Sequence, residues 1–115
     1  IRIEAAKALN KHGKEGAKAI PSLEKMIARG DSDSRIAMMN AAVSLGTDGS
    51  PTLNAVAKNL QSEEPKVRIK AAETLGKFGK LAEAQIPMLQ KSLNDEDSNV
   101  RNAVSSALLK IRFGS

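Results

Sequence analysis

The chain has 115 residues, a formal net charge of +5, 41% hydrophobic residues and 27% charged residues, which is the size and composition of one ordinary globular domain. It contains no cysteine, one histidine, and two phenylalanines as its only aromatic residues. We therefore exclude disulfide frameworks and thiol chemistry, expect neither a metal nor a cofactor, and find no platform on which bases or sugars could stack.

Membrane and export signals are also missing from this sequence. No apolar run approaches the roughly 20 residues that a membrane span needs, and no signal-peptide pattern opens the sequence. We expect a soluble, cytoplasmic protein.

The sequence repeats itself with a period of 33 residues. The segment Ile1–Leu9 returns 66 positions later as Val67–Leu75, and Val100 with Arg101 follows 33 positions after the second copy. Such self-similarity is typical of repeat proteins. It predicts a single array made of repeats at about 1–32, 33–63 and 64–96, with a half repeat at 97–115.

The middle unit fits this period less well when identical residues are aligned. Ala41, Ala42 and Leu45 lie 36 positions after their counterparts in the first copy and 30 before those in the third. We therefore expect a longer turn ahead of this unit and a shorter one, residues 47–50, within it. In this alignment Ala37 or Met38 takes the place of the arginine that follows the first hydrophobic residue of the other units.

Each unit is predicted to form two helices. In the first helix of the third unit, apolar residues recur every three or four positions, and the second helices repeat the pattern. Small alanines on this stripe allow close helix packing. The stripes are Val67, Ala71, Thr74, Leu75 and Phe78 in that first helix, and Ile20, Leu23 and Ile27, then Ile86, Leu89 and Leu93, in two second helices.

Helix starts are marked by acids and prolines. Asp33, Glu64 and Asp97 each precede a first helix where an N-cap or a first-turn acid is favoured, and Pro65 follows where a missing N–H costs nothing. Prolines also stand in or near the first turns of the second helices. Glycines are expected to close first helices or turns, at positions 13, 46, 76, 79 and 114.

The pattern V-R-x-x-A-A-x-x-L-G-x-x-G, followed by I-P-x-L and an acidic turn, resembles the HEAT repeat. The most similar sub-type is the short HEAT unit of phycobilisome-lyase-like proteins. This resemblance implies an all-α, right-handed α-α superhelix of about 3.5 repeats, or seven helices, whose second helices line the concave surface. The abrupt start at Ile1 suggests a fragment of a longer array, whose exposed end helices could stack on another copy.

Two sets of polar residues recur at the period. Arg2, Arg68 and Arg101 form one ladder, which we interpret as structural, pairing with turn carbonyls or with acids such as Asp33 and Asp97; the alternative is a basic recognition stripe. Lys25, Lys58 and Lys91 form a second ladder on the second helices, off the apolar stripe. The resemblance places this ladder, with its neighbouring amides, in the concave groove; the amides are Asn54, Gln61 and Asn94.

Charge is also divided between the two edges of the predicted array. Acids concentrate in the turns between units, and lysines concentrate around the turns within units, which is partly what helix dipoles favour. The methionines and His12 are interpreted as packing or helix-end residues, because no acid-base or nucleophilic arrangement surrounds them.

Three functions remain for a chain with no catalytic motif. The first is a non-catalytic scaffold that binds an acidic helix or extended protein segment along the lysine ladder. The second is binding of a nucleic-acid backbone or phosphate through the lysine ladder and the basic turn edge. The third, chromophore lyase activity, is implied only by the resemblance to phycobilisome-lyase-like units, and the chain offers no residue to carry it.

Overall fold

The computed structural model describes residues 20–46 and 51–113, and side chains from Lys25 onward. In these residues the chain forms six α-helices and two 3₁₀ segments. In chain order they are α3 (Ile20–Arg29), α4 (Ser32–Ser44), α5 (Leu53–Lys58), η2 (Asn59–Gln61), α6 (Pro65–Phe78), η3 (Gly79–Gln85), α7 (Ile86–Ser92) and α8 (Ser98–Phe113).

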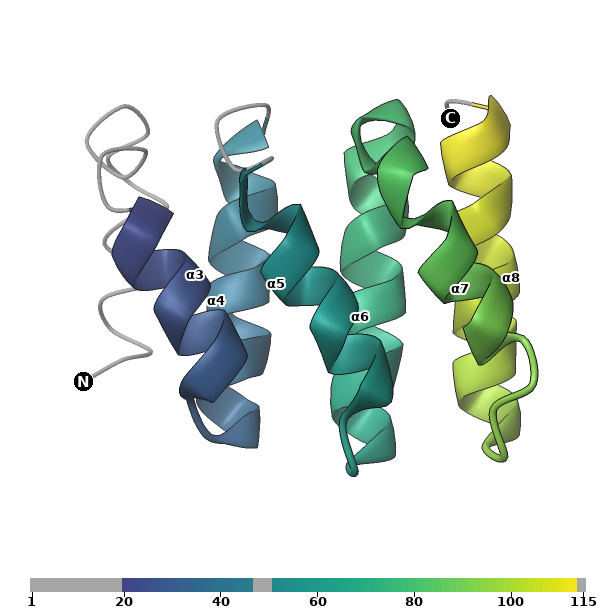
Figure 1. Ribbon diagram of the computed structural model, residues 1–115, viewed down its shortest axis with the longest axis horizontal. Coiled ribbons are helices and arrows are strands. Elements are labelled where there is room, and N and C mark those ends of the chain that lie inside the picture. Colours follow the sequence, from purple (N-terminus) through teal and green to yellow (C-terminus); the bar gives the residue numbers. More distant parts are fainter. Residues whose placement is uncertain (1–19, 47–50, 114–115) are drawn as a thin grey trace.

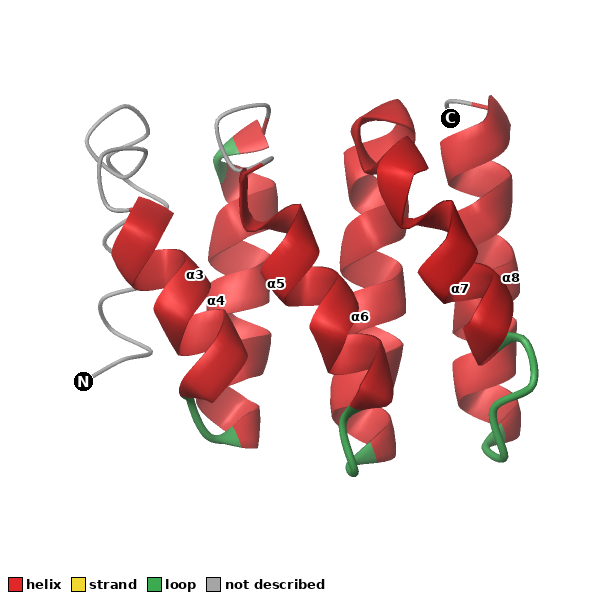
Figure 2. Ribbon diagram, in the orientation of Figure 1, coloured by secondary structure: helices red, strands yellow, loops and turns green. Residues whose placement is uncertain are grey.

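The helices form two layers. α4, α6 and α8 stand side by side in one layer, and α3, α5 and α7 lie across them in the other (Figure 1). Each second helix packs on the first helix of the next unit: α3 on α4, α5 on α6 and α7 on α8. The loops that follow α3, η2 and α7 all lie along one edge of the array (Figure 2). The all-α stack of helix pairs is therefore confirmed, while the right-handed sense of the superhelix stays a prediction.

The first of the seven expected helices falls outside the described residues. Arg2 and His12 belong to that part of the chain. None of the helices in the described ranges is long and apolar enough to cross a membrane.

The core follows the 33-residue period without a gap. Leu45, Phe78 and Ile111 are 8%, 8% and 0% exposed, and each is 33 residues from the next. Gly46 and Gly79 follow the first two of these residues, and both have a φ of +60°, a conformation that glycine adopts without strain. Three further sets at the same spacing are buried: Met38, Ala71 and Val104; Ala41, Thr74 and Ala107; Ala42, Leu75 and Leu108.

The expected offset of the middle unit is therefore wrong. Matching Ala41 and Ala42 to the alanine pairs of the other units displaced the alignment by three residues. The structural counterparts of Ala71 and Ala72 are Met38 and Met39, which are 1% and 0% exposed. Larger side chains fill the same buried positions, so residue identity misled where burial does not.

One buried glycine sets the distance between α6 and α8. A Cβ atom added at Gly76 would lie 3.1 Å from the Cα of Ala107 and 3.3 Å from its Cβ. Gly76 therefore does not close a helix or turn, as its position in the sequence indicated; it lies inside α6 and lets the neighbouring helix approach. The expectation that small residues permit close packing is confirmed at this contact.

The helix starts are capped at equivalent positions of two units. Oδ1 of Asp31 accepts a hydrogen bond of 2.8 Å from the Ser34 N–H at the start of α4. Oδ1 of Asp97 accepts from the N–H groups of Asn99 and Val100 at the start of α8, at 2.8 and 3.2 Å. The prediction for Asp97 is thus confirmed.

Two other predicted caps differ from the observed ones. Asp33 lies within α4, and its side chain is 77% exposed, so Asp31 is the N-cap in its place. Glu64 does occupy the N-cap position of α6, but its side chain makes no capping hydrogen bond, and Pro65 stands in the first turn as predicted.

Candidate binding surface

The lysine ladder lies on three neighbouring second helices. Lys25 is on α3, Lys58 is the last residue of α5 and Lys91 is on α7, and all three are exposed. α3 contacts α5, and α7 contacts η2, the continuation of α5. Packed helices are about 8–10 Å apart, so equivalent positions on the three helices form a row with steps of this length.

The lysines are not engaged by the described part of the protein. The ion pairs among described side chains join Lys66 to Asp33 and Glu64, Arg68 to Asp95, and Lys70 to Glu73. None of these acids contacts a lysine of the row. The three ammonium groups therefore face solvent with their charge uncompensated by these carboxylates.

The three predicted amides have different surroundings. Oδ1 of Asn54 accepts a hydrogen bond of 3.0 Å from Nε2 of Gln85, which links α5 to the end of η3. Gln61 and Asn94 are exposed and occupy equivalent positions, three residues after Lys58 and Lys91. Gln61 and Asn94 are thus available to a ligand next to their lysines, whereas Asn54 also joins two repeats.

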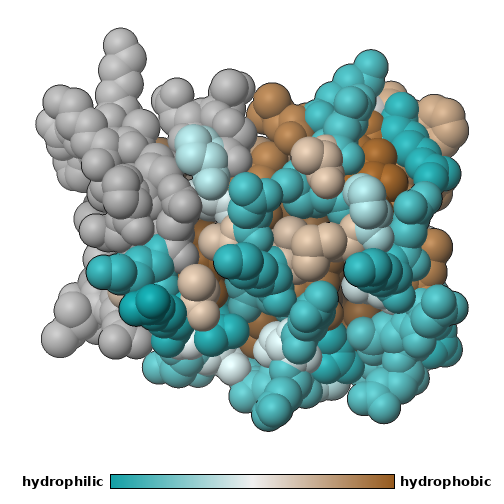
Figure 3. Space-filling model, viewed as in Figure 1, coloured by the Kyte–Doolittle hydropathy of each residue, from teal (hydrophilic) through white to brown (hydrophobic). Residues whose placement is uncertain are grey.

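Figure 3 shows the face formed by the second helices. Hydrophilic side chains recur across this face from α3 to α7, with apolar side chains between them. Ala55 and Met88 are partly buried apolar residues three positions before Lys58 and Lys91. The face therefore alternates between charged and apolar strips.

The arginine ladder has a different environment. Arg68 is 7% exposed. Its Nη1 donates a hydrogen bond of 2.7 Å to the Ser62 carbonyl, and its Nε and Nη2 lie 2.9 and 3.2 Å from the two carboxylate oxygens of Asp95. Arg68 therefore joins the turn before α6 to the turn after α7, which is a structural role.

The same role extends to Arg101 and to an arginine that our sequence alignment missed. Nη1 of Arg101 donates to the Asp95 carbonyl at 2.6 Å. Nε of Arg35 donates to the Gly30 carbonyl at 2.6 Å, and its Nη1 donates to Oδ1 of Asn59 at 3.0 Å. Arg35 is 33 residues after Arg2 and 33 before Arg68. The ladder is thus unbroken in the middle unit, and this spacing was the signal that identifies it.

The acids expected to pair with these arginines are not their partners. Asp33 binds Lys66 at 3.5 Å, and Asp97 caps α8 through its side chain. Asp95 takes the arginine instead. Its Oδ1 also accepts a hydrogen bond of 2.9 Å from the Asp97 N–H, so the turn folds around the carboxylate that receives Arg68.

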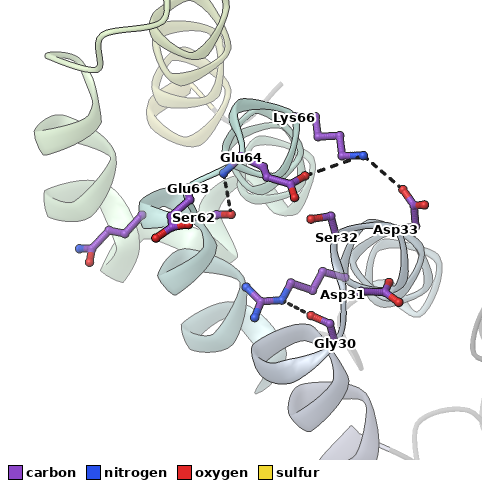
Figure 4. A pocket seen from close by; sticks show the side chains of 10 residues that line it. Gly30, Asp31, Ser32, Asp33, Ser62, Glu63, Glu64 and Lys66 are labelled. Atoms are coloured by element: carbon purple, nitrogen blue, oxygen red, sulfur yellow. Dashed lines mark hydrogen bonds and ion pairs between the residues drawn. The ribbon is translucent and has the colours of Figure 1, made fainter.

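A polar groove lies along the edge that carries the turns between units (Figure 4). It has a volume of about 790 Å³ between the turn after α3 and the turn after η2. Lys66 spans the two turns, at 3.5 Å from Asp33 and 3.8 Å from Glu64. A smaller hollow of about 380 Å³ lies one repeat further, beside Arg68 and Asp95. The acids of this edge serve capping and ion pairing, and no group of them in the described residues is placed to hold a metal ion.

Comparison with known proteins supports the repeat architecture. The family model for HEAT repeats matches residues 31–109, and no curated protein matches the chain. HEAT repeats generally act as protein-interaction scaffolds and are typically non-catalytic. The more specific likeness to phycobilisome-lyase-like units stays a prediction. The match covers more than half of the chain and agrees with the stacked helix pairs of the structure, so this protein belongs to the HEAT repeat family.

Proposed function

We propose that this chain is a protein-binding scaffold that holds an acidic segment of its partner against the second-helix face. The observation that carries the proposal is the row of Lys25, Lys58 and Lys91, which are exposed at equivalent positions of adjacent helices. Complementary charge accelerates encounter and discriminates among partners, even where each exposed pair contributes little affinity.

The test is charge reversal with a matched control. The triple variant Lys25→Glu, Lys58→Glu, Lys91→Glu removes the row. The control variant Lys77→Glu, Lys80→Glu, Lys110→Glu changes three exposed lysines outside the row. Either variant takes the formal net charge from +5 to −1, so a difference between them reports position and not overall charge.

Binding to a poly-glutamate peptide is measured by fluorescence anisotropy at low salt. We expect the first variant to lose at least tenfold in affinity, which corresponds to three exposed ion pairs of about 0.5 kcal/mol each. The control variant should lose less than threefold. Equal losses in the two variants would show that net charge, and not the row, attracts the acidic segment.

Nucleic-acid backbone binding is the alternative, and the same variants separate it from the proposal. Exposed Lys77, Lys80, Lys110 and Arg112 would add to the charge available for phosphates. Phosphate contacts give an affinity that falls log-linearly with salt concentration. Binding to a 20-base-pair duplex that exceeds peptide binding, with a steep salt slope that both triple variants reduce, would favour this alternative.

A further inference from the structure

We infer that the preferred partner is an extended, polyproline II-like segment that carries an acidic residue at every third position. This inference rests on the proposed function and adds the conformation and spacing of the ligand. It follows from the step between Lys25, Lys58 and Lys91, which occupy one position on three packed helices.

The step of the lysine row selects among backbone conformations. Neighbouring packed helices lie about 8–10 Å apart. A polyproline II helix has three residues per turn and rises about 3.1 Å per residue, so every third side chain points the same way at intervals of about 9 Å. In a β-strand, side chains on one face are about 6.6 or 13 Å apart, which misses this step. Polyproline II therefore places one carboxylate at each lysine.

An α-helix with an acid at every seventh residue also matches the step, because seven residues rise about 10.5 Å. The amides beside the lysines distinguish the two. Gln61 and Asn94 are exposed three residues after Lys58 and Lys91, and an amide both donates and accepts hydrogen bonds. A polyproline II backbone has no internal hydrogen bonds, so its free carbonyl groups can accept from these amides. The backbone of an α-helix is already paired with itself.

The apolar strips between the lysines favour the same ligand. Ala55 and Met88 are partly buried and precede Lys58 and Lys91 by three residues. A segment with acids at every third position has two other residues per turn, and proline or alanine at those positions would contact these strips. Each turn of the ligand would then meet one repeat in the same way.

The experiment compares two proline-rich peptides of identical composition. In one, three Glu-Pro-Pro triplets place glutamate at every third position; in the other, the three glutamates are adjacent in the centre. Both favour polyproline II, so only the register differs. A third, alanine-based helical peptide has glutamate at every seventh position. Each is labelled and titrated with the full chain and with both triple lysine variants at low salt.

We expect the triplet peptide to bind about fivefold tighter than its isomer, which is the effect of two additional exposed ion pairs. This advantage should disappear in the Lys25→Glu, Lys58→Glu, Lys91→Glu variant and remain in the control variant. Equal binding of the two proline-rich peptides, still dependent on the row, would refute the register and leave the proposed function standing. Tighter binding of the helical peptide would refute the extended conformation. No binding of any peptide would overturn both proposals.

Discussion

Arg68 and Asp95 form a two-point ion pair across a whole repeat, with the guanidinium Nε and Nη2 at 2.9 and 3.2 Å from the two carboxylate oxygens. Their side chains are 8% and 11% exposed. Because Arg68 also donates to the Ser62 carbonyl, the pair ties two successive turns together. A stack in which each unit contacts only its neighbours depends on such links between units.

The buried pair predicts a large difference between two arginines of one ladder. Arg68→Ala leaves the Asp95 carboxylate nearly buried without its partner, which should lower the free energy of unfolding by about 3 kcal/mol. Arg101→Ala removes an exposed side chain with one hydrogen bond and should cost below about 1 kcal/mol. Urea unfolding followed by circular dichroism measures both. Similar losses for the two variants would mean that Arg68 contributes no more than a surface residue.

Asn59 is expected to be another sensitive position, because it joins three parts of the fold. It is 2% exposed; its Nδ2 donates to the carbonyls of Ile27 and Ala55, and its Oδ1 accepts from Arg35. Asn59→Ala removes these bonds and should cost about 2–3 kcal/mol in stability. Asn54→Ala, at an exposed site, is the matched control and should cost below about 1 kcal/mol.

A double-mutant cycle tests the link between Asn59 and Arg35 directly. If their hydrogen bond of 3.0 Å stabilises the fold, Arg35→Ala and Asn59→Ala together should cost about 1 kcal/mol less than the sum of the single variants. Strict additivity would show that the two side chains act independently.

Gly76 predicts an effect whose sign differs from that of helix propensity. Alanine is about 1 kcal/mol better than glycine inside a helix, which taken alone would stabilise α6. The added Cβ would lie 3.1 Å from the Ala107 Cα, so α6 and α8 must separate, at a cost of about 1–3 kcal/mol. We expect Gly76→Ala to lower the thermal midpoint. A rise in the midpoint would show that the helices can move apart freely.

The observed cap of α4 predicts which aspartate of its first turn matters. Asp31→Ala removes the hydrogen bond to the Ser34 N–H and should cost about 1 kcal/mol. Asp33→Ala removes an exposed ion pair with Lys66 and should change stability by less than about 0.5 kcal/mol. Chemical denaturation distinguishes the two. The opposite order would restore Asp33 as the cap that the sequence indicated.

Much of the architecture was predictable because it is written in local patterns. The 33-residue period, the apolar stripes and the proline at the start of α6 each depend on residues close together in the chain, and the structure confirms the helix pairs they predict. Exposure of Lys25, Lys58 and Lys91 followed from the same periodicity. The true register of the middle unit was also present, since Arg35 keeps the period, but the matching of identical alanines obscured it.

Only the tertiary structure decided which polar groups meet. Arg68 and Asp95 are 27 residues apart, and Asn59 contacts a carbonyl 32 residues before it. Several acids of the turns stand at similar distances along the chain, so sequence spacing does not distinguish Asp95 from Asp97. The choice depends on how each turn directs its carboxylate and on how closely α6 and α8 pack at Gly76. Both are set by the summed packing of neighbouring repeats, which no local pattern encodes.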